Sequence, residues 1–144
     1  MWGVYNDSGL KYGARIYGTE YEFGEDFGDG GGMYFGSNLY NHDVPCSVCY
    51  TTRSAAVMIP GRNQCYPGWT KEYSGYLVSG RNGLNAVDAS ASNYACLDTT
   101  PEISNYDYRD VDGKLMVLVE AKCGSLACPP YVENREITCV VCSK

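Results

Sequence analysis

Eight cysteines are the side chains of this sequence most able to do chemistry, and four of them form two Cys-x-x-Cys pairs. The pairs are Cys46 with Cys49 and Cys139 with Cys142. Two such pairs are the raw material of a Cys₄ zinc site, but some 90 residues separate them, much further than in a zinc ribbon. No βαβ pattern surrounds either pair, as a thioredoxin-like redox motif would require. Eight cysteines in 144 residues therefore favour disulfides and an oxidising, extracellular compartment, with zinc as the rival interpretation.

The chain holds one histidine, His42, so a Cys–His or Ser–His nucleophilic site would have to use it. The nearest cysteine, Cys46, is expected in a disulfide, and a bonded sulfur is no nucleophile. The sequence has no GxSxG or HExxH motif. The glycine-rich residues 28–32 precede no apolar helix, so they do not form a phosphate-binding loop. We therefore expect a protein that is not an enzyme.

Tyrosine is unusually abundant, with 14 residues against 3 phenylalanines. A tyrosine ring combines a flat apolar face with a hydroxyl group and suits recognition, including the stacking of sugars. The richest stretch predicts a ligand-binding platform made of Arg62, Asn63, Tyr66, Trp69, Tyr73 and Tyr76. The alternative is packing, because alternate residues of a strand over 71–79 should face a core. Tyr73 and Leu77 would then share one face, with Glu72, Ser74 and Tyr76 on the other.

A second set of polar residues could supply oxygen ligands. The acidic, glycine-rich loop predicts a calcium site at Glu25, Asp26 and Asp29. Asn41, His42 and Asp43 are added as ligand-binding candidates for a calcium-bridged sugar. The loop lacks the ligand spacing of an EF-hand, so the alternative is a solvated turn.

Charge and hydropathy exclude two classes of partner. The net charge of −6 argues against nucleic acid and anionic membranes, which both need a basic face. The longest aliphatic run, residues 115–119, is far too short to insert into a membrane. Residues 1–5 have no secretory signal, so a secreted form would be a mature chain or a fragment.

The elements that must position these residues are short strands. Helical periodicity is almost absent, and 17 glycines and 6 prolines interrupt the chain. Strands are expected over residues 15–23, 55–60, 71–79, 114–122 and 136–142, with Asp112-Gly113 starting a hairpin arm. The sequence thus predicts an all-β, disulfide-rich domain.

The strings around the two Cys-x-x-Cys pairs, residues 43–49 and 136–142, are similar and predict an internal duplication. Each half should end in such a strand. Residues 1–53 would form an incomplete first β subdomain, and residues 54–144 a second one with six cysteines. The first half keeps no partners for Cys46 and Cys49, which would bond each other, another chain or an upstream segment.

Residues 41–49, 58–77, 123–131 and 136–144 carry a family resemblance. They resemble the C-terminal noncollagenous domain of invertebrate short-chain, spongin-like collagens and their stand-alone relatives, over about residues 17–144. A fainter similarity is to the C-terminal domain of type IV collagen, a β-rich duplication. The chain has no Gly-X-Y stretch, so it forms no collagen triple helix itself.

The resemblance implies disulfides Cys65–Cys142, Cys96–Cys139 and Cys123–Cys128. Spacing alone leaves about 15 pairings open, and the chief competitor joins Cys65 to Cys96 and the two Cys-x-x-Cys pairs to each other. The resemblance also implies a secreted extracellular-matrix or adhesion module that associates with copies of itself or with other matrix proteins. The alternative function is a calcium-dependent lectin that binds glycans, with calcium as its cofactor.

Overall fold

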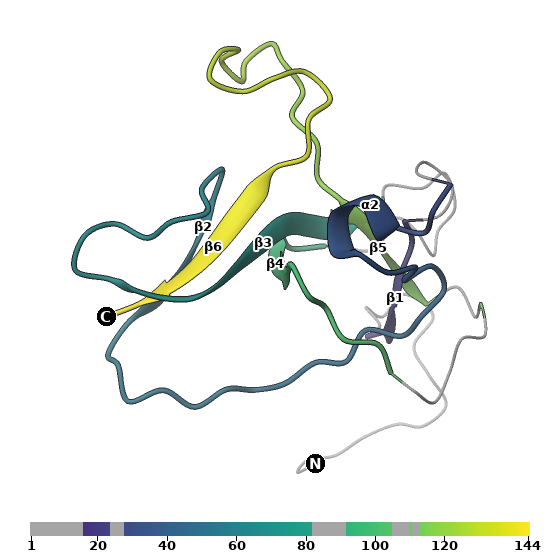
Figure 1. The fold of residues 1–144 in the computed structure, drawn as a ribbon, viewed down its shortest axis with the longest axis horizontal. Coiled ribbons are helices and arrows are strands. Elements are labelled where there is room, and N and C mark those ends of the chain that lie inside the picture. The colour runs from purple at the N-terminus through teal and green to yellow at the C-terminus, as the bar shows by residue number, and fades with distance from the viewer. Residues whose placement is uncertain (1–15, 24–27, 82–91, 105–109, 111–112) are drawn as a thin grey trace, which may run out of the picture.

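One six-stranded β-sheet organises the part of the chain that the computed structural model describes, residues 16–23, 28–81, 92–104, 110 and 113–144. Along the sheet the strand order is β1-β5-β3-β6-β2, and β4 pairs with β3 outside that path (Figure 1). The elements are β1 (Thr19–Tyr21), α2 (Gly32–Phe35), β2 (Ala56–Pro60), β3 (Thr70–Gly80), β4 (Ala95–Asp98), β5 (Lys114–Leu118) and β6 (Thr138–Ser143). The all-β, disulfide-rich fold expected from the sequence is confirmed, and the helix α2 is a single turn.

The longest strand, β3, holds the sheet together. It pairs antiparallel with β6, β4 and β5. At Gly75 a Cβ atom would lie 1.7 Å from the carbonyl oxygen of Leu97, so only glycine lets β4 come this close. A bulge between Lys71 and Tyr73 interrupts the pairing with β6. The bulge turns Glu72 toward the side of Ser143, so the predicted grouping of Glu72 with Tyr76 on one face is wrong.

An aromatic cluster forms the core beside β3. Tyr21, Phe23, Phe35, Leu39, Val78 and Leu118 are its buried members. Tyr76 packs edge-on against the rings of Tyr34 and Phe35, with ring centroids 5.3 and 5.7 Å away. Several tyrosines of this chain are therefore structural, as the packing alternative expected.

Three disulfides join Cys65 to Cys142, Cys96 to Cys139 and Cys123 to Cys128. These are the pairs that the family resemblance implies, and the competing pairing through Cys65–Cys96 is wrong. The zinc interpretation is also wrong, because Cys139 and Cys142 are bonded to other cysteines. Since these two residues stand three positions apart on β6, their side chains leave on opposite faces. One face is thereby linked to β4 and the other to the loop between β2 and β3.

The first 53 residues do not end as the duplication predicts. Residues 45–50 form no strand and are exposed, whereas β6, at the matching position, lies hydrogen-bonded between β2 and β3. No strand of the described residues flanks residues 45–50, so this stretch lacks the two neighbours that make β6 a strand. β1 instead pairs in parallel with β5, so both predicted halves contribute to one sheet.

Two elements were not expected, β4 and α2. The predicted hairpin turn at Asp112-Gly113 falls partly outside the described residues.

Candidate functional site

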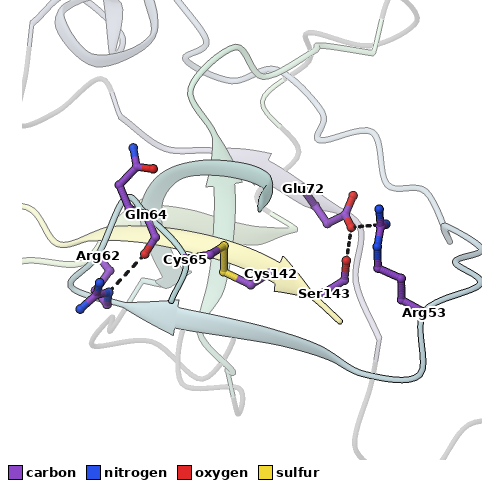
Figure 2. The surroundings of a disulfide bond; sticks show 7 residues. All are labelled: Arg53, Arg62, Gln64, Cys65, Glu72, Cys142 and Ser143. Atoms are coloured by element: carbon purple, nitrogen blue, oxygen red, sulfur yellow. Dashed lines mark hydrogen bonds and ion pairs between the residues drawn. A yellow bond between two sulfur atoms is a disulfide. The ribbon is translucent and has the colours of Figure 1, made fainter. Parts of the chain in front are cut away.

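The loop between β2 and β3, residues 61–69, carries four of the six residues of the predicted platform. Trp69 donates its backbone N–H to the carbonyl oxygen of Tyr66 at 3.1 Å, across a Pro-Gly pair. The φ of Gly68 is +83°, as the third position of a type II turn requires. Cys65, just before this turn, ties the loop to β6 through Cys142 (Figure 2). Turn and disulfide together fix the loop on one face of the sheet.

Arg62 is held in place on this loop. Its Nε–H donates a hydrogen bond of 3.2 Å to the carbonyl oxygen of Gln64 (Figure 2), and its guanidinium lies 4.2 Å from the ring centroid of Tyr66. The Tyr66 ring remains 51% exposed, and Asn63 beside it is also exposed. This is a cation–π pair whose aromatic ring keeps exposed surface that a ligand could contact.

Two lysines reach the same face from the strands. Lys71 stands opposite Cys142 in the β3–β6 register, and residues paired in this way point to the same face. Lys144 follows Cys142 by two positions, and its Nζ lies 3.9 Å from where a Cβ on Gly68 would be. We call the surface made by Arg62, Tyr66, Lys71 and Lys144 the cationic face. Sequence reasoning missed both lysines, because their proximity depends on strand register.

The opposite face of the same strands is occupied by a different contact. Arg53 pairs with Glu72 at 2.8 Å, and the Ser143 hydroxyl donates to the same carboxylate oxygen (Figure 2). Arg53 is therefore neutralised locally and does not belong to the cationic face.

The six residues of the predicted platform do not all lie together in the structure. Arg62, Asn63 and Tyr66 share the loop, and the half-buried Trp69 closes its turn. Tyr76 lies against the core, so its assignment to a sugar platform is wrong for a packing reason. Tyr73 faces another site, because the bulge in β3 points it toward the Cys96–Cys139 disulfide, and its hydroxyl donates to the carbonyl oxygen of Cys96 at 3.2 Å.

Tyr73 lines a cleft of about 510 Å³ between residues 44–47 and residues 96–102. The carboxylates of Asp98 and Glu102 line it as well. At its base the Tyr21 hydroxyl donates to the carbonyl oxygen of Glu102 at 2.9 Å. Burial, followed by the nearby Cys46 and Glu102, raises the pKa of Tyr21 to about 12. Burial, with Asp98 and then Cys49 adding to it, also raises the pKa of Tyr73, so both phenols stay protonated at neutral pH.

The predicted calcium ligands are used otherwise or lie outside the described residues. Asp29 accepts backbone N–H groups from Gly31 at 3.0 Å and Met33 at 2.8 Å, so its carboxylate organises the entry to α2. Glu25 and Asp26 lie outside the described residues. Across the residues that are described, no three His, Cys, Asp or Glu side chains are grouped to hold a metal ion.

The Asn41, His42 and Asp43 string lies along β1. The backbone N–H of Tyr21 donates to the carbonyl oxygen of His42, and the N–H of Asn41 donates to that of Tyr21, both at 3.0 Å. The buried Asn41 Oδ1 and His42 Nδ1 have no hydrogen-bond partner among the described residues. β1 and the β2–β3 loop stand at different ends of the molecule's long axis (Figure 1), so this string and the cationic face do not form one site.

Two free thiols mark a further surface. Cys46 and Cys49 are exposed and unbonded, and Val48 and Tyr50 beside them are 104% and 90% exposed. Two thiols and two large apolar or aromatic side chains thus alternate along a stretch that pairs with no strand of the described residues.

No family model matches the chain, and no curated protein or solved structure is significantly similar to it. The resemblance to spongin-like collagen domains therefore remains a prediction from the motifs. No helix among the described residues is long and apolar enough to span a membrane.

Proposed function

We propose that this chain is a non-enzymatic, secreted extracellular module that associates with copies of itself through residues 45–50. The observation that carries the proposal is the exposed run of Cys46, Val48, Cys49 and Tyr50 on a chain whose other six cysteines are bonded.

The physical argument rests on what this run leaves unsatisfied. Single exposed apolar residues are ordinary, but here they share a stretch of backbone that pairs with no described strand. An extended stretch of this kind can add to a strand of a second copy and bury Val48 and Tyr50. Once two copies are paired, Cys46 or Cys49 lies close enough to a partner thiol for a disulfide to form under oxidising conditions.

The test measures the oligomeric state of the native protein by light scattering at micromolar concentration, followed by non-reducing electrophoresis. We expect the native protein to form an oligomer. In a Cys46→Ser/Cys49→Ser variant the association should be weaker, and the covalent bond between copies should be absent. A Val48→Ser/Tyr50→Ser variant, which keeps both thiols, separates burial from disulfide formation. A monomer whose peptide map contains a Cys46–Cys49 bond within one chain would overturn the proposal.

The calcium-dependent lectin remains the alternative. The cleft that contains Tyr73, Asp98 and Glu102 is the place where it would bind, since oxygen groups and an aromatic ring meet there. A glycan array run with calcium and again with chelator separates the two functions. Selective calcium-dependent binding by a monomer would favour the lectin.

A further inference from the structure

Cationic side chains gather at one end of the folded molecule, although the net charge of the chain is −6. Residues 51–72 and 138–144 contain four Lys or Arg side chains and one acidic side chain, Glu72. Glu72 is paired with Arg53. The ion pairs among the described residues leave Arg62, Lys71 and Lys144 without an acidic partner. An acidic protein thus presents a local, uncompensated positive surface.

The three cations lie on one side of the sheet. Cys142 links β6 to the loop that carries Arg62, so this loop covers the face to which the Cys142 side chain points. Lys71 pairs with Cys142 across the strands, and Lys144 follows it with the strand period of two. The approach of Lys144 to Gly68 agrees with this placement.

The loop that carries Arg62 and Tyr66 is organised before any ligand arrives. The disulfide and the turn at Pro67-Gly68 fix the loop backbone, and the bond to Gln64 together with the Tyr66 ring fixes Arg62. Side chains that are already ordered lose little conformational entropy on binding.

We propose that the cationic face binds a sulfated polysaccharide, with sulfate groups on Arg62, Lys71 and Lys144 and a sugar ring on the exposed surface of Tyr66. Guanidinium and ammonium groups form strong charge-assisted hydrogen bonds to such oxyanions. The exposed amides of Asn63 and Gln64 add partners for sugar hydroxyls.

Polysaccharide is favoured over nucleic acid by the compartment in which disulfides persist. Disulfides persist outside the cell, where sulfated polysaccharides are the abundant polyanions. The overall negative charge repels every polyanion, so we expect contacts to be confined to the short cationic face. The choice of polysaccharide rests on the extracellular location in the proposed function, whereas the binding itself does not depend on self-association.

The test is fluorescence anisotropy with a labelled heparin octasaccharide at pH 7 in EDTA. It uses the Cys46→Ser/Cys49→Ser variant, so that thiol-linked oligomers do not add avidity. We expect binding at 50 mM salt and about 20-fold weaker binding at 200 mM, as three charge contacts predict from counterion release. Adding calcium should not change the affinity for heparin.

Matched variants locate the site. Arg62→Gln, Lys71→Gln and Lys144→Gln should each weaken binding about fivefold, the contribution of one cation near an anionic surface. Arg53→Gln changes the net charge equally but lies on the other face, so it should change binding less than twofold. Tyr66→Ala should cost about threefold, from the lost cation–π pair and stacking. Tyr94→Ala, another exposed tyrosine, is the control for loss of an aromatic ring.

Several results would overturn the proposal. Absence of binding at 50 mM salt, or an Arg53→Gln effect as large as that of Arg62→Gln, would show that no specific cationic site exists. Tighter binding of single-stranded DNA of equal charge would exclude polysaccharide as the preferred ligand. A requirement for calcium would exclude the direct cation–sulfate mechanism. Because heparin binding is measured on the Cys46→Ser/Cys49→Ser variant, these outcomes can be interpreted even if the self-association proposal fails.

Discussion

Removing the Cys65–Cys142 disulfide should destabilise the protein more than removing Cys123–Cys128. The first bond joins residues 77 apart, but Cys96–Cys139 already bridges 43 of these, which leaves a loop of about 34 residues. Chain entropy then gives a stabilisation of about 4 kcal/mol for Cys65–Cys142. The second bond closes a separation of 5 residues, for which the same relation gives about 2 kcal/mol.

The assay is urea unfolding followed by tryptophan fluorescence, on a Cys46→Ser/Cys49→Ser background that prevents disulfide exchange. Cys65→Ala/Cys142→Ala and Cys123→Ala/Cys128→Ala are compared at pH 7. We expect the former to lose about 2 kcal/mol more free energy of unfolding than the latter. Since Cys142 is fully buried, its truncation adds a small cavity cost in the same direction.

The reasoning fails if Cys123→Ala/Cys128→Ala costs as much as Cys65→Ala/Cys142→Ala. Such a result would mean that local strain or interactions in the unfolded chain, rather than loop closure, determine what each bond contributes. The same variants also report on the cationic face, because the loop with Arg62 loses its covalent link only in the former.

Three further changes test other parts of the structure. Gly75→Ala should lower the free energy of unfolding in urea by more than about 2 kcal/mol, because a Cβ atom there would overlap the Leu97 carbonyl oxygen. Gly18→Ala is the control and should change this free energy little, since a Cβ atom there would meet nothing within 4 Å. Equal effects of the two variants would refute the close approach of β4. The pKa of Tyr21 is raised in the folded protein, so the contribution of Tyr21 to stability is complete below pH 10 and falls by about 3 kcal/mol as the pH rises from 10 to about 12. Rapid alkaline unfolding measurements should show this fall in the free energy of unfolding. A Tyr21→Phe variant with the same pH dependence would exclude Tyr21 as its source. Asp29→Ala should lower the free energy of unfolding by about 1 kcal/mol, because two backbone N–H groups lose the carboxylate that caps them. If calcium instead raises the thermal midpoint of the parent protein but not of this variant, Asp29 is a calcium ligand after all.

Local patterns explain which strands could be predicted from the sequence. β2, β3 and β6 coincide closely with the expected residues 55–60, 71–79 and 136–142, because their apolar and alternating side chains lie within each segment. β4 was not predicted, since its place depends on the space that Gly75 leaves in a distant strand. α2 was missed because four residues are too few for a helical period, and its two ends are set by glycines in the left-handed conformation.

The same distinction holds for the candidate site. Arg62, Asn63 and Tyr66 were found because they are near neighbours in sequence. Lys144 could not be added to them without the β3–β6 register and the disulfide of Cys142. The platform prediction grouped Tyr73 with Tyr76, but strand alternation places them on opposite faces, as the packing alternative expected, and Tyr76 packs against the aromatic cluster.

The two Cys-x-x-Cys stretches show how strongly neighbours determine structure in this chain. Val140 lies between the cysteines of β6 and is fully buried, whereas Ser47, at the matching position, is exposed beside the cleft. Residues 44–47 are one wall of that cleft, so a second copy that pairs with residues 45–50 would also fix the wall. If the chain self-associates in this way and also binds a ligand in the cleft, the two events would be coupled through the same stretch of backbone. A ligand that favours one position of this wall would then shift the oligomer equilibrium by an equal free energy.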